Sequence, residues 1–391
     1  MTSPASEPAP GWRWTRWLPL ATAVALALAV VFLRVCEVEA EGDLYHERAE
    51  QLLAGTVVFD AFHPFGYVLL LAAVHVFVSP SLVAGGLVSA AAAGVLVWST
   101  GVVAETLRPG AGGPARLFAA SNGVVWVLGT MACSDMTSAA LVMWAAALLC
   151  RSPGQLGFGR SVAIGSLLGY AVGSRFGSLG VAALVCLWTV LRCPRARSVS
   201  GLAVGVLAGL APQAWLAALV DKTPLQNDNW HNMVLKIVCD DDLSRLQHLY
   251  DSGTLPSLSD FLREHGGDLL WRAGLDSVTA VGQVLPSLLM GSLRPVDGLQ
   301  LWPLLLALAG LWFAAPRRRL AAVLTVLAAA ATFSVCIAIA PRGRQLFSAI
   351  PFLFAGLAAA LAALHARGGV CRAILPALWL ATVGVGGAQF H

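Results

Sequence analysis

The chain has 391 residues, of which 58% are apolar and 12% are charged. Soluble proteins carry about 25% charged residues, so most of this chain must be solvated by lipid. The net charge of +4 comes from arginines in short turns between apolar runs, as is usual on the cytoplasmic side of membrane proteins. The composition therefore excludes a soluble enzyme and gives no reason to expect a nucleic-acid partner.

The first apolar run, at 17–36, follows two tryptophans and two arginines, Trp12, Arg13, Trp14 and Arg16. Apolar runs of about 20 residues must be helical in lipid, because every backbone N–H and C=O needs a partner within the segment. The flanking residues are typical of an interfacial aromatic belt with a cytoplasmic anchor. We therefore expect an uncleaved span with the N-terminus in the cytoplasm. A cleavable signal peptide is the alternative, although its apolar region normally has about 7–15 residues.

Five arginine-bearing turns orient the rest of the chain: Arg108 with Arg116, Arg151 with Arg160, Arg192 to Arg197, Arg317 to Arg319, and Arg367 with Arg372. The positive-inside rule places these turns in the cytoplasm. The spans that fit lie near 81–106, 116–132, 137–150, 161–174, 177–191, 201–220, 298–315, 320–340, 345–364 and 373–389. We therefore predict an all-α membrane protein with about 11 transmembrane helices and its C-terminus outside.

One apolar stretch, Phe65 to Val78, is left over by this assignment. It is short for a span, and counting it as one would put every later arginine turn outside. We predict a helix that lies along or dips into the outer membrane surface and has Pro64 at its first turn. A short ordinary span is the alternative.

The acidic residues are gathered on the predicted outer side, which holds 19 of the 21. Most of them fall in two segments, a first outer loop at 37–79 and a long outer loop at 221–297. We expect one polytopic domain over 1–391, multi-pass in the cell membrane and in contact with membrane lipid. Functional chemistry is then expected at its outer face.

Eight cysteines show neither a CxxC pair nor Cys/His metal spacing, so no zinc site is expected. Cys36, Cys133, Cys239 and Cys336 are all expected on or near the outer face, where they either include one disulfide or are buried free thiols.

Gly165, Gly169 and Gly173 recur every fourth residue, a spacing that lets membrane helices approach closely.

Two acidic residues interrupt the apolar background near predicted helix starts. Asp43, in EGDLYHERAEQLLAG, precedes a segment that looks helical from Leu44, so it is either an N-cap or a catalytic carboxylate. Asp135 stands alone between two spans, where it is either an N-cap or a functional group, because an unpaired charge at membrane depth is costly.

Three arginines oppose the positive-inside trend at the outer face: Arg175, Arg342 and Arg344. Their partner is either the acidic outer loop, through a salt bridge, or a lipid phosphate, for which arginine offers a planar fork of donors.

The order of these residues resembles that of polytopic glycosyltransferases of the GT-C superfamily, especially bacterial relatives of protein O-mannosyltransferases and of the aminoarabinose transferase of lipid A (family 39-like). The resemblance covers most of the chain. It runs through Asp43 with Tyr45, Ala49, Leu52 and Gly55, then His63 to Tyr67, Ser134 with Asp135, Arg175 with Phe176, Asn227 to Asn232, and Arg344 to Pro351. It implies a helix bundle with juxtamembrane helices in the first outer loop.

The resemblance implies transfer of a sugar from a polyprenyl-phosphate donor to a lipid, glycan or protein acceptor at the outer face, with inversion and without a nucleotide sugar at the site. Asp43 would be the base, and Asp135 would orient the acceptor or share the charge. The residues expected to contact substrate are Arg175, Arg342, Arg344, His63, Tyr67, Trp230 and His231.

Two departures from the family pattern bear on these roles. Leu44 follows Asp43 where relatives often have a second acid, and Gln345 follows Arg344 where they have tyrosine. Glu41 is therefore kept as a substitute base, and the phosphate contacts are less firmly assigned than Asp43.

No cofactor is assigned, although Asp240, Asp241 and Asp242 lie near His231 and His248 and leave a divalent cation open; a solvated acidic run is the alternative. The rival function is a transporter or flippase of a lipid-linked or anionic substrate. It would favour charges deep within helices and inverted repeats, which the sequence does not show.

Overall fold

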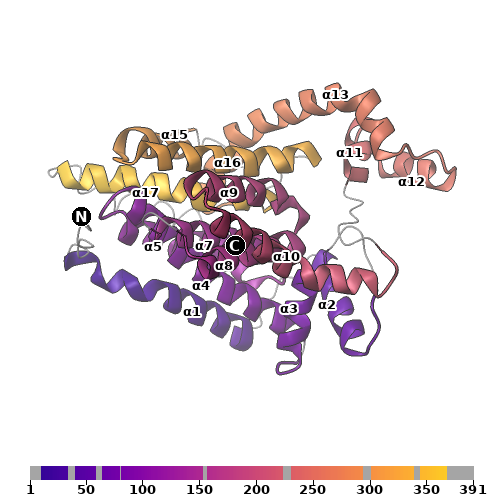
Figure 1. Cartoon of the computed structure of the whole chain (residues 1–391), viewed down its shortest axis with the longest axis horizontal. Coiled ribbons are helices and arrows are strands. Elements are labelled where there is room, and N and C mark those ends of the chain that lie inside the picture. The colour runs from indigo at the N-terminus through magenta and orange to yellow at the C-terminus, as the bar shows by residue number, and fades with distance from the viewer. Residues whose placement is uncertain are drawn as a thin grey trace.

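The computed structural model of the protein describes residues 10–33, 40–58, 64–79, 81–152, 156–222, 230–293, 301–338 and 344–367, and every regular element in these ranges is helical (Figure 1). The first half contains η1 (Pro10–Trp17), α1 (Leu18–Leu33), α2 (Ala40–Leu53), α3 (Phe65–His75), α4 (Ser81–Leu107), α5 (Gly112–Ser121), α6 (Gly123–Thr130), α7 (Ser134–Cys150), α8 (Phe158–Ser174), η2 (Phe176–Ser178), α9 (Leu179–Arg192) and α10 (Ala196–Ala218). The second half contains α11 (Trp230–Ile237), α12 (Leu243–Asp251), α13 (Leu258–Thr279), η3 (Ala280–Val284), α14 (Leu285–Leu289), α15 (Trp302–Ala309), η4 (Gly310–Ala314), α16 (Arg318–Ala338), η5 (Gln345–Ala349) and α17 (Ile350–Arg367).

Five of the described helical segments are long and apolar enough to cross a membrane: Arg13–Leu33, Leu82–Leu107, Ala196–Ala218, Arg318–Ile337 and Gln345–Arg367. A sixth arises if α6 and α7, which meet at 116°, form one broken span. The predicted all-α, multi-pass membrane fold is therefore confirmed. The total of about 11 spans stays a prediction, and the span expected at 373–389 lies outside the described residues.

The arginine-bearing turns meet at one end of the bundle. Arg108 donates a hydrogen bond to the carbonyl O of Ala314 at 2.5 Å, which joins the turn after α4 to the end of η4. Arg192, at the end of α9, donates to Leu149 O at 3.0 Å and to Ser152 O at 2.9 Å. The opposite end carries α2, α3, α11 and α12 (Figure 1). These contacts fit the predicted grouping of the arginine turns on one side of the membrane.

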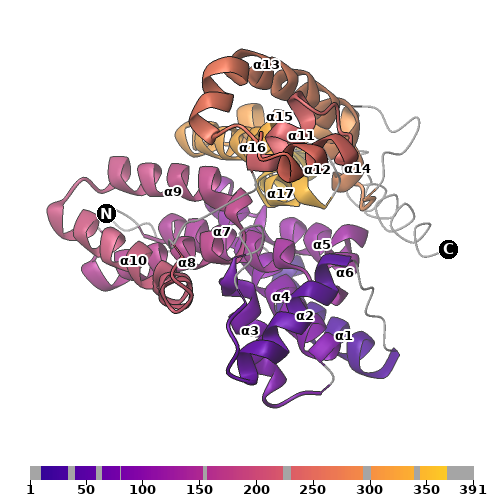
Figure 2. The same ribbon diagram turned by 90° about the vertical axis from the view of Figure 1, so that its right-hand side faces the viewer.

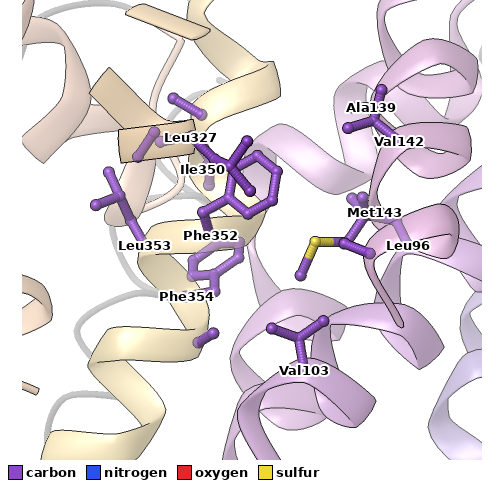
Figure 3. Close-up of a cluster of buried hydrophobic side chains, with 14 of the residues drawn as sticks. Leu96, Val103, Ala139, Val142, Met143, Leu327, Ile350, Phe352, Leu353 and Phe354 are labelled. Carbon is purple, nitrogen blue, oxygen red and sulfur yellow. The ribbon is translucent and has the colours of Figure 1, made fainter. Parts of the chain in front are cut away.

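The core is densest around α17, whose side chains are buried almost throughout. Phe352 and Phe354 of α17 face Leu96 of α4 and Met143 of α7, and all four are at most 1% exposed (Figure 3). Small residues fill the remaining contacts, which allows α4, α7, α16 and α17 to pack closely without strained side chains.

α8 and α10 approach each other backbone to backbone. A methyl group added at Gly205 would lie 2.2 Å from the carbonyl O of Val162, and one added at Gly165 would lie 2.3 Å from that of Leu202. Only glycine permits this distance. The glycines at every fourth residue therefore allow α8 and α10 to pack closely within the chain.

The structure divides the predicted span at 116–132 into α5 and α6. Buried Asn122 stands at the break, where its side-chain oxygen accepts from the N–H groups of Val124 and Val125. Its amide donates to the carbonyl groups that end α14, those of Leu288 at 3.0 Å and Leu289 at 3.3 Å. One side chain thus satisfies backbone groups at two helix ends, as a low-dielectric environment requires.

The segment predicted as a long outer loop contains more helix than its polar sequence suggested. The longest helix of this segment, α13, continues through η3 into the buried helix α14. Lys236 of α11 is buried, pairs with Asp276 of α13 at 2.5 Å, and donates to the carbonyl O of Cys336 in α16. These contacts attach the segment to the bundle.

Candidate functional site around Asp135 and Arg175

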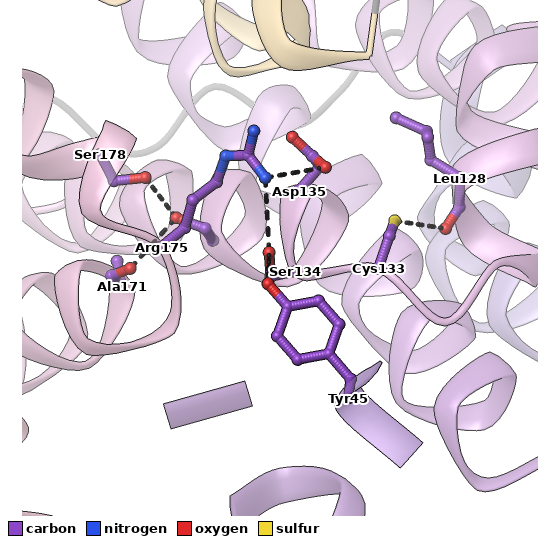
Figure 4. A network of polar contacts seen from close by, with 9 residues as sticks. Tyr45, Leu128, Cys133, Ser134, Asp135, Ala171, Arg175 and Ser178 are labelled. Atoms are coloured by element: carbon purple, nitrogen blue, oxygen red, sulfur yellow. Dashed lines mark hydrogen bonds and ion pairs between the residues drawn. The ribbon is translucent and has the colours of Figure 1, made fainter. Parts of the chain in front are cut away.

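At the end of the bundle opposite the arginine turns, Asp135 and Arg175 form an ion pair. Asp135 lies in the first turn of α7, and Arg175 directly follows α8. Their side chains meet at 3.0 Å, with 4% and 22% of their surfaces exposed (Figure 4). The N-cap interpretation of Asp135 is wrong, because Cys133 occupies that position and Asp135 turns to the guanidinium. A buried carboxylate is tolerated here because it is paired.

Tyr45 connects α2 to this ion pair. Its hydroxyl shares a hydrogen bond of 3.1 Å with the Ser134 hydroxyl, which also accepts from Arg175 at 3.4 Å (Figure 4). The ring of Tyr45 stands edge-on to that of Tyr67, with centroids 5.0 Å apart. The sequence pattern contained Tyr45 and Ser134 but gave no sign that their hydroxyl groups meet.

Asp43 lies two residues before Tyr45 on the same helix. Because α2 begins at Ala40, Asp43 belongs to its first turn, and the N-cap alternative considered for it is wrong. The side chains of Asp43 and Glu41 lie outside the described residues, as do His63 and Arg342. Their proposed roles therefore stay predictions.

Below the ion pair, α7 is tied to the turn after α8. The hydroxyl groups of Ser138 and Ser178 are hydrogen-bonded, and Ser138 also donates to the carbonyl O of Ala171 at 3.3 Å (Figure 4). This network fixes the backbone on either side of Arg175. The arginine is thus held by its surroundings as well as by its partner.

The start of α3 is anchored on α8 and α10. The N–H of Phe65 donates to the Gln213 side chain at 2.6 Å, and Tyr170 donates to the carbonyl O of Gly66 at 2.7 Å. A methyl group at Gly66 would lie 2.6 Å from the backbone of Gly173. Tyr67 is fully buried by this packing. Its position supports Tyr45, and direct contact with a substrate stays a prediction.

Arg344 lies on the same side of the bundle as the ion pair. It immediately precedes η5, which packs on α7. The charges of Asp135, Arg175 and Arg344 all act on the buried thiol of Cys133. Arg175 and Arg344, two of the three arginines predicted at the outer face, thus both lie in the neighbourhood of Cys133, and only Arg175 has a described contact with Asp135.

Trp230 and His231 take part in the packing between α11 and α12. His231 is buried against Trp230, with ring centroids 4.1 Å apart, and is hydrogen-bonded to the hydroxyl of Tyr250. These contacts join α11 to α12 and do not link either residue to Asp135. A role in acceptor or sugar binding stays a prediction.

The acidic triplet is partnered by an arginine. Arg245 lies 3.5 Å from Asp240 and 3.6 Å from Asp242. Asp242 is the N-cap of α12. Its pKa is lowered by two hydrogen bonds from Ser244, of which the one from the hydroxyl has the larger effect and the one from the backbone N–H the smaller. Within the described ranges, no three His, Cys, Asp or Glu side chains converge as metal ligands would.

None of the cysteines within the described ranges forms a disulfide: Cys133, Cys150, Cys186, Cys193, Cys239 and Cys336. Three of the four cysteines considered for an outer disulfide are therefore unpaired with one another. The fourth, Cys36, lies outside the described residues.

No protein-family model matches the chain, and no curated protein matches its sequence. Solved structures match its fold. ArnT from Cupriavidus metallidurans bound to undecaprenyl phosphate aligns at a TM-score of 0.58 and 16% identity, over 90% of this chain and 60% of that one. The Archaeoglobus fulgidus oligosaccharyltransferase tethered with an acceptor peptide aligns at a TM-score of 0.56 and 13% identity, over 96% of this chain and 55% of that one.

Both neighbours are GT-C glycosyltransferases, so the chain has a GT-C-like fold, as the resemblance implied. The chain spans 60% of the length of the first neighbour and 55% of the second. At these identities the likeness concerns the fold alone.

Proposed function

We propose that this multi-pass membrane protein with a GT-C-like fold is a glycosyltransferase that uses a polyprenyl-phosphate sugar donor. The acceptor is a lipid, glycan or protein hydroxyl at the outer face of the cell membrane, and the N-terminus is cytoplasmic. The observation that carries the proposal is the junction of α2, α7 and the turn after α8, where Tyr45, Ser134, Asp135 and Arg175 are joined at the end opposite the arginine turns.

The proposed reaction is a single displacement with inversion. The acceptor oxygen attacks the anomeric carbon, the bond from that carbon to the phosphate oxygen breaks, and polyprenyl phosphate leaves with the electron pair. The acceptor proton passes to a carboxylate, for which Asp43 is the candidate. A carboxylate serves this purpose because it is ionised near neutral pH and can be held within hydrogen-bond reach.

Arginine is suited to the leaving phosphate. The guanidinium presents a planar fork of donors, and charge-assisted hydrogen bonds to phosphate are about twice as strong as neutral ones. Arg175 retains 22% exposed side-chain surface beside Asp135, and the charge of Arg344, like that of Arg175, acts on the neighbouring Cys133. In this proposal Asp135 orients Arg175 and prevents it from turning away from the phosphate, while Arg344 and Arg342 contribute further positive charge.

The test is sugar transfer by purified protein in proteoliposomes, with undecaprenyl-phosphate-linked radiolabelled sugars offered as a panel. Asp43→Asn removes the base and preserves size, and we expect transfer to fall by about 10²-fold or more. Glu47→Gln is the matched control, because Glu47 is an exposed carboxylate on the same helix whose described contact is with Gln51 at 3.0 Å.

The remaining outcomes separate the alternatives. Full activity in Asp43→Asn, with loss in Glu41→Gln, would move the base to Glu41. Loss only in Asp135→Asn would move it to Asp135. Absence of transfer from every donor by the folded wild type would refute the proposal, and translocation of a fluorescent lipid phosphate would then favour a flippase.

A further inference from the structure

Six arginines lie in two turns at the end of the bundle opposite the candidate site. α9 and α16, to which these turns belong, pack side by side (Figure 2). The charges of Arg192 and Arg317, one from each turn, both act on the buried thiol of Cys150. The two turns therefore form one positively charged surface, the α9–α16 arginine surface, whose exposed members are Arg192, Arg195, Arg197, Arg317, Arg318 and Arg319.

The positive charge of this surface is not neutralised by the described part of the chain. Arg192 donates hydrogen bonds to the carbonyl O atoms of Leu149 and Ser152, which are neutral acceptors. Within the described ranges, no carboxylate lies within ion-pair distance of any of the six arginines. Each guanidinium has five N–H donors, so donors remain for an anion that comes from outside the chain.

Glu105, an acidic residue at the same end of the bundle, is engaged by the backbone of its own turn. Its two carboxylate oxygens accept hydrogen bonds from the N–H groups of Gly110 at 3.0 Å and Gly112 at 2.9 Å. These bonds close the turn after α4. Glu105 therefore serves that turn and is not a described partner of the α9–α16 arginine surface.

The arginine surface lies at the depth of lipid headgroups. The apolar helix from Arg318 to Ile337 is long enough to cross a membrane, so Arg318 marks one boundary of the hydrocarbon core. Leu191, next to Arg192, is 72% exposed, and Phe313, four residues before Arg317, is 89% exposed. Exposed apolar side chains at this depth contact acyl chains. A lipid with an anionic head matches both the arginines and the apolar residues beside them.

We propose that the α9–α16 arginine surface is a binding site for an anionic phospholipid of the leaflet at this end of the bundle, which is cytoplasmic in the proposed orientation. Basic surfaces between membrane helices on that side suit anionic headgroups. The phosphodiester receives charge-assisted hydrogen bonds from the guanidinium groups, and the acyl chains lie along the apolar side chains. This site is separate from the proposed reaction, because Asp135 and Arg175 lie at the opposite end of the bundle.

A site and a diffuse field make different predictions. Diffuse attraction between an anionic leaflet and a basic protein depends on the total charge at that end. A site depends on which arginines are present. Arg13 and Arg16 provide the comparison, because they are exposed at the start of α1, whose helix packs on α4, α5 and α6. Removing two charges there and two charges from the arginine surface changes the net charge equally.

The test is native mass spectrometry of the purified full-length protein in detergent micelles, titrated with phosphatidylglycerol. Phosphatidylcholine with the same acyl chains is the neutral comparison. Arg317→Gln/Arg318→Gln removes two charges from the arginine surface, and Arg13→Gln/Arg16→Gln is the matched control. If the first variant does not fold, as judged by thermal unfolding without added lipid, Arg195→Gln/Arg197→Gln removes two charges from the other turn and carries the same prediction.

We expect the wild type and Arg13→Gln/Arg16→Gln to retain phosphatidylglycerol with equal affinity and the arginine-surface variant to bind it about tenfold more weakly. Phosphatidylglycerol should also raise the thermal unfolding midpoint of the wild type more than that of the arginine-surface variant. Equal weakening in both variants would reduce the effect to a diffuse field and overturn the inference. Equal retention of phosphatidylcholine, or preferential binding of undecaprenyl phosphate at these arginines, would also overturn it. The readout needs no sugar transfer, so its outcome is independent of the proposed function.

Discussion

Loss of either member of the Asp135 and Arg175 pair should destabilise the protein, but by unequal amounts. The Asp135 side chain is only 4% exposed, so Arg175→Gln leaves a carboxylate that cannot reach water. Breaking a buried pair in this way costs about 3–5 kcal/mol. In Asp135→Asn the guanidinium keeps 22% exposed surface and its contact with Ser134, so we expect a loss of about 1–2 kcal/mol.

The double variant Asp135→Asn/Arg175→Gln separates charge from packing. With both charges removed, no uncompensated ion remains, and the variant should recover at least about 2 kcal/mol of the loss seen in Arg175→Gln. Its folding should therefore approach that of Asp135→Asn. Sugar transfer should stay lost, because the double variant still lacks the proposed phosphate-binding cation.

The assay is reversible unfolding of the purified proteins in mixed micelles of a mild detergent and SDS, followed by tryptophan fluorescence. The wild type, both single variants and the double variant complete the cycle. Equal destabilisation by the two single substitutions, or strict additivity in the double variant, would refute the reasoning. The first result would mean that Asp135 reaches solvent, and the second that the two side chains do not interact.

Three further substitutions test other contacts. Tyr45→Phe removes the hydrogen bond to Ser134 and should cost about 1 kcal/mol and lower kcat with little change in KM; unchanged kcat would show that this contact does not position α2. In Gly205→Ala the added methyl would meet the Val162 carbonyl, which should prevent α8 and α10 from pairing and sharply reduce the yield of folded protein. Gly159→Ala is the control, because Gly159 has open space around it and its substitution should not reduce the yield. Asn122→Ala leaves buried backbone groups at two helix ends without partners and should cost about 2–3 kcal/mol in the same micelle assay; an unchanged midpoint would contradict its bridging role.

The long apolar spans were predictable because composition alone decides them. α4, α10, α16 and α17 follow runs in which lipid is the only suitable solvent, and their ends coincide with arginine turns. The break at Asn122 was not predictable, because one polar residue within an apolar run does not reveal that its partners lie 166 and 167 residues later. The buried helix α14 was not predictable either, because it lies in the segment at 221–297, whose polar beginning predicted an outer loop.

The candidate site was predictable as a set of residues but not as a geometry. Asp135 and Arg175 stand out because each interrupts an apolar background at a helix end. Their pairing requires α7 and α8 to be adjacent, which the sequence does not show, and the partners considered for the arginine were the acidic outer loop and a lipid phosphate. Tyr45 and Ser134 carry no such signal, since hydroxyl groups are common at helix ends and only tertiary contact shows that they meet.

The burial of α17 has a consequence for biosynthesis. This helix packs against α4, α5, α15 and α16, yet it leaves the ribosome after all of them. The surfaces of α4 and α7 that contact Phe352 and Phe354 are therefore uncovered in the bilayer while more than half of the chain is translated. In water such exposed faces would aggregate, but in a bilayer lipid tails cover them at little cost. Late insertion of the central helix is thus an assembly order that the membrane permits and an aqueous solvent would not.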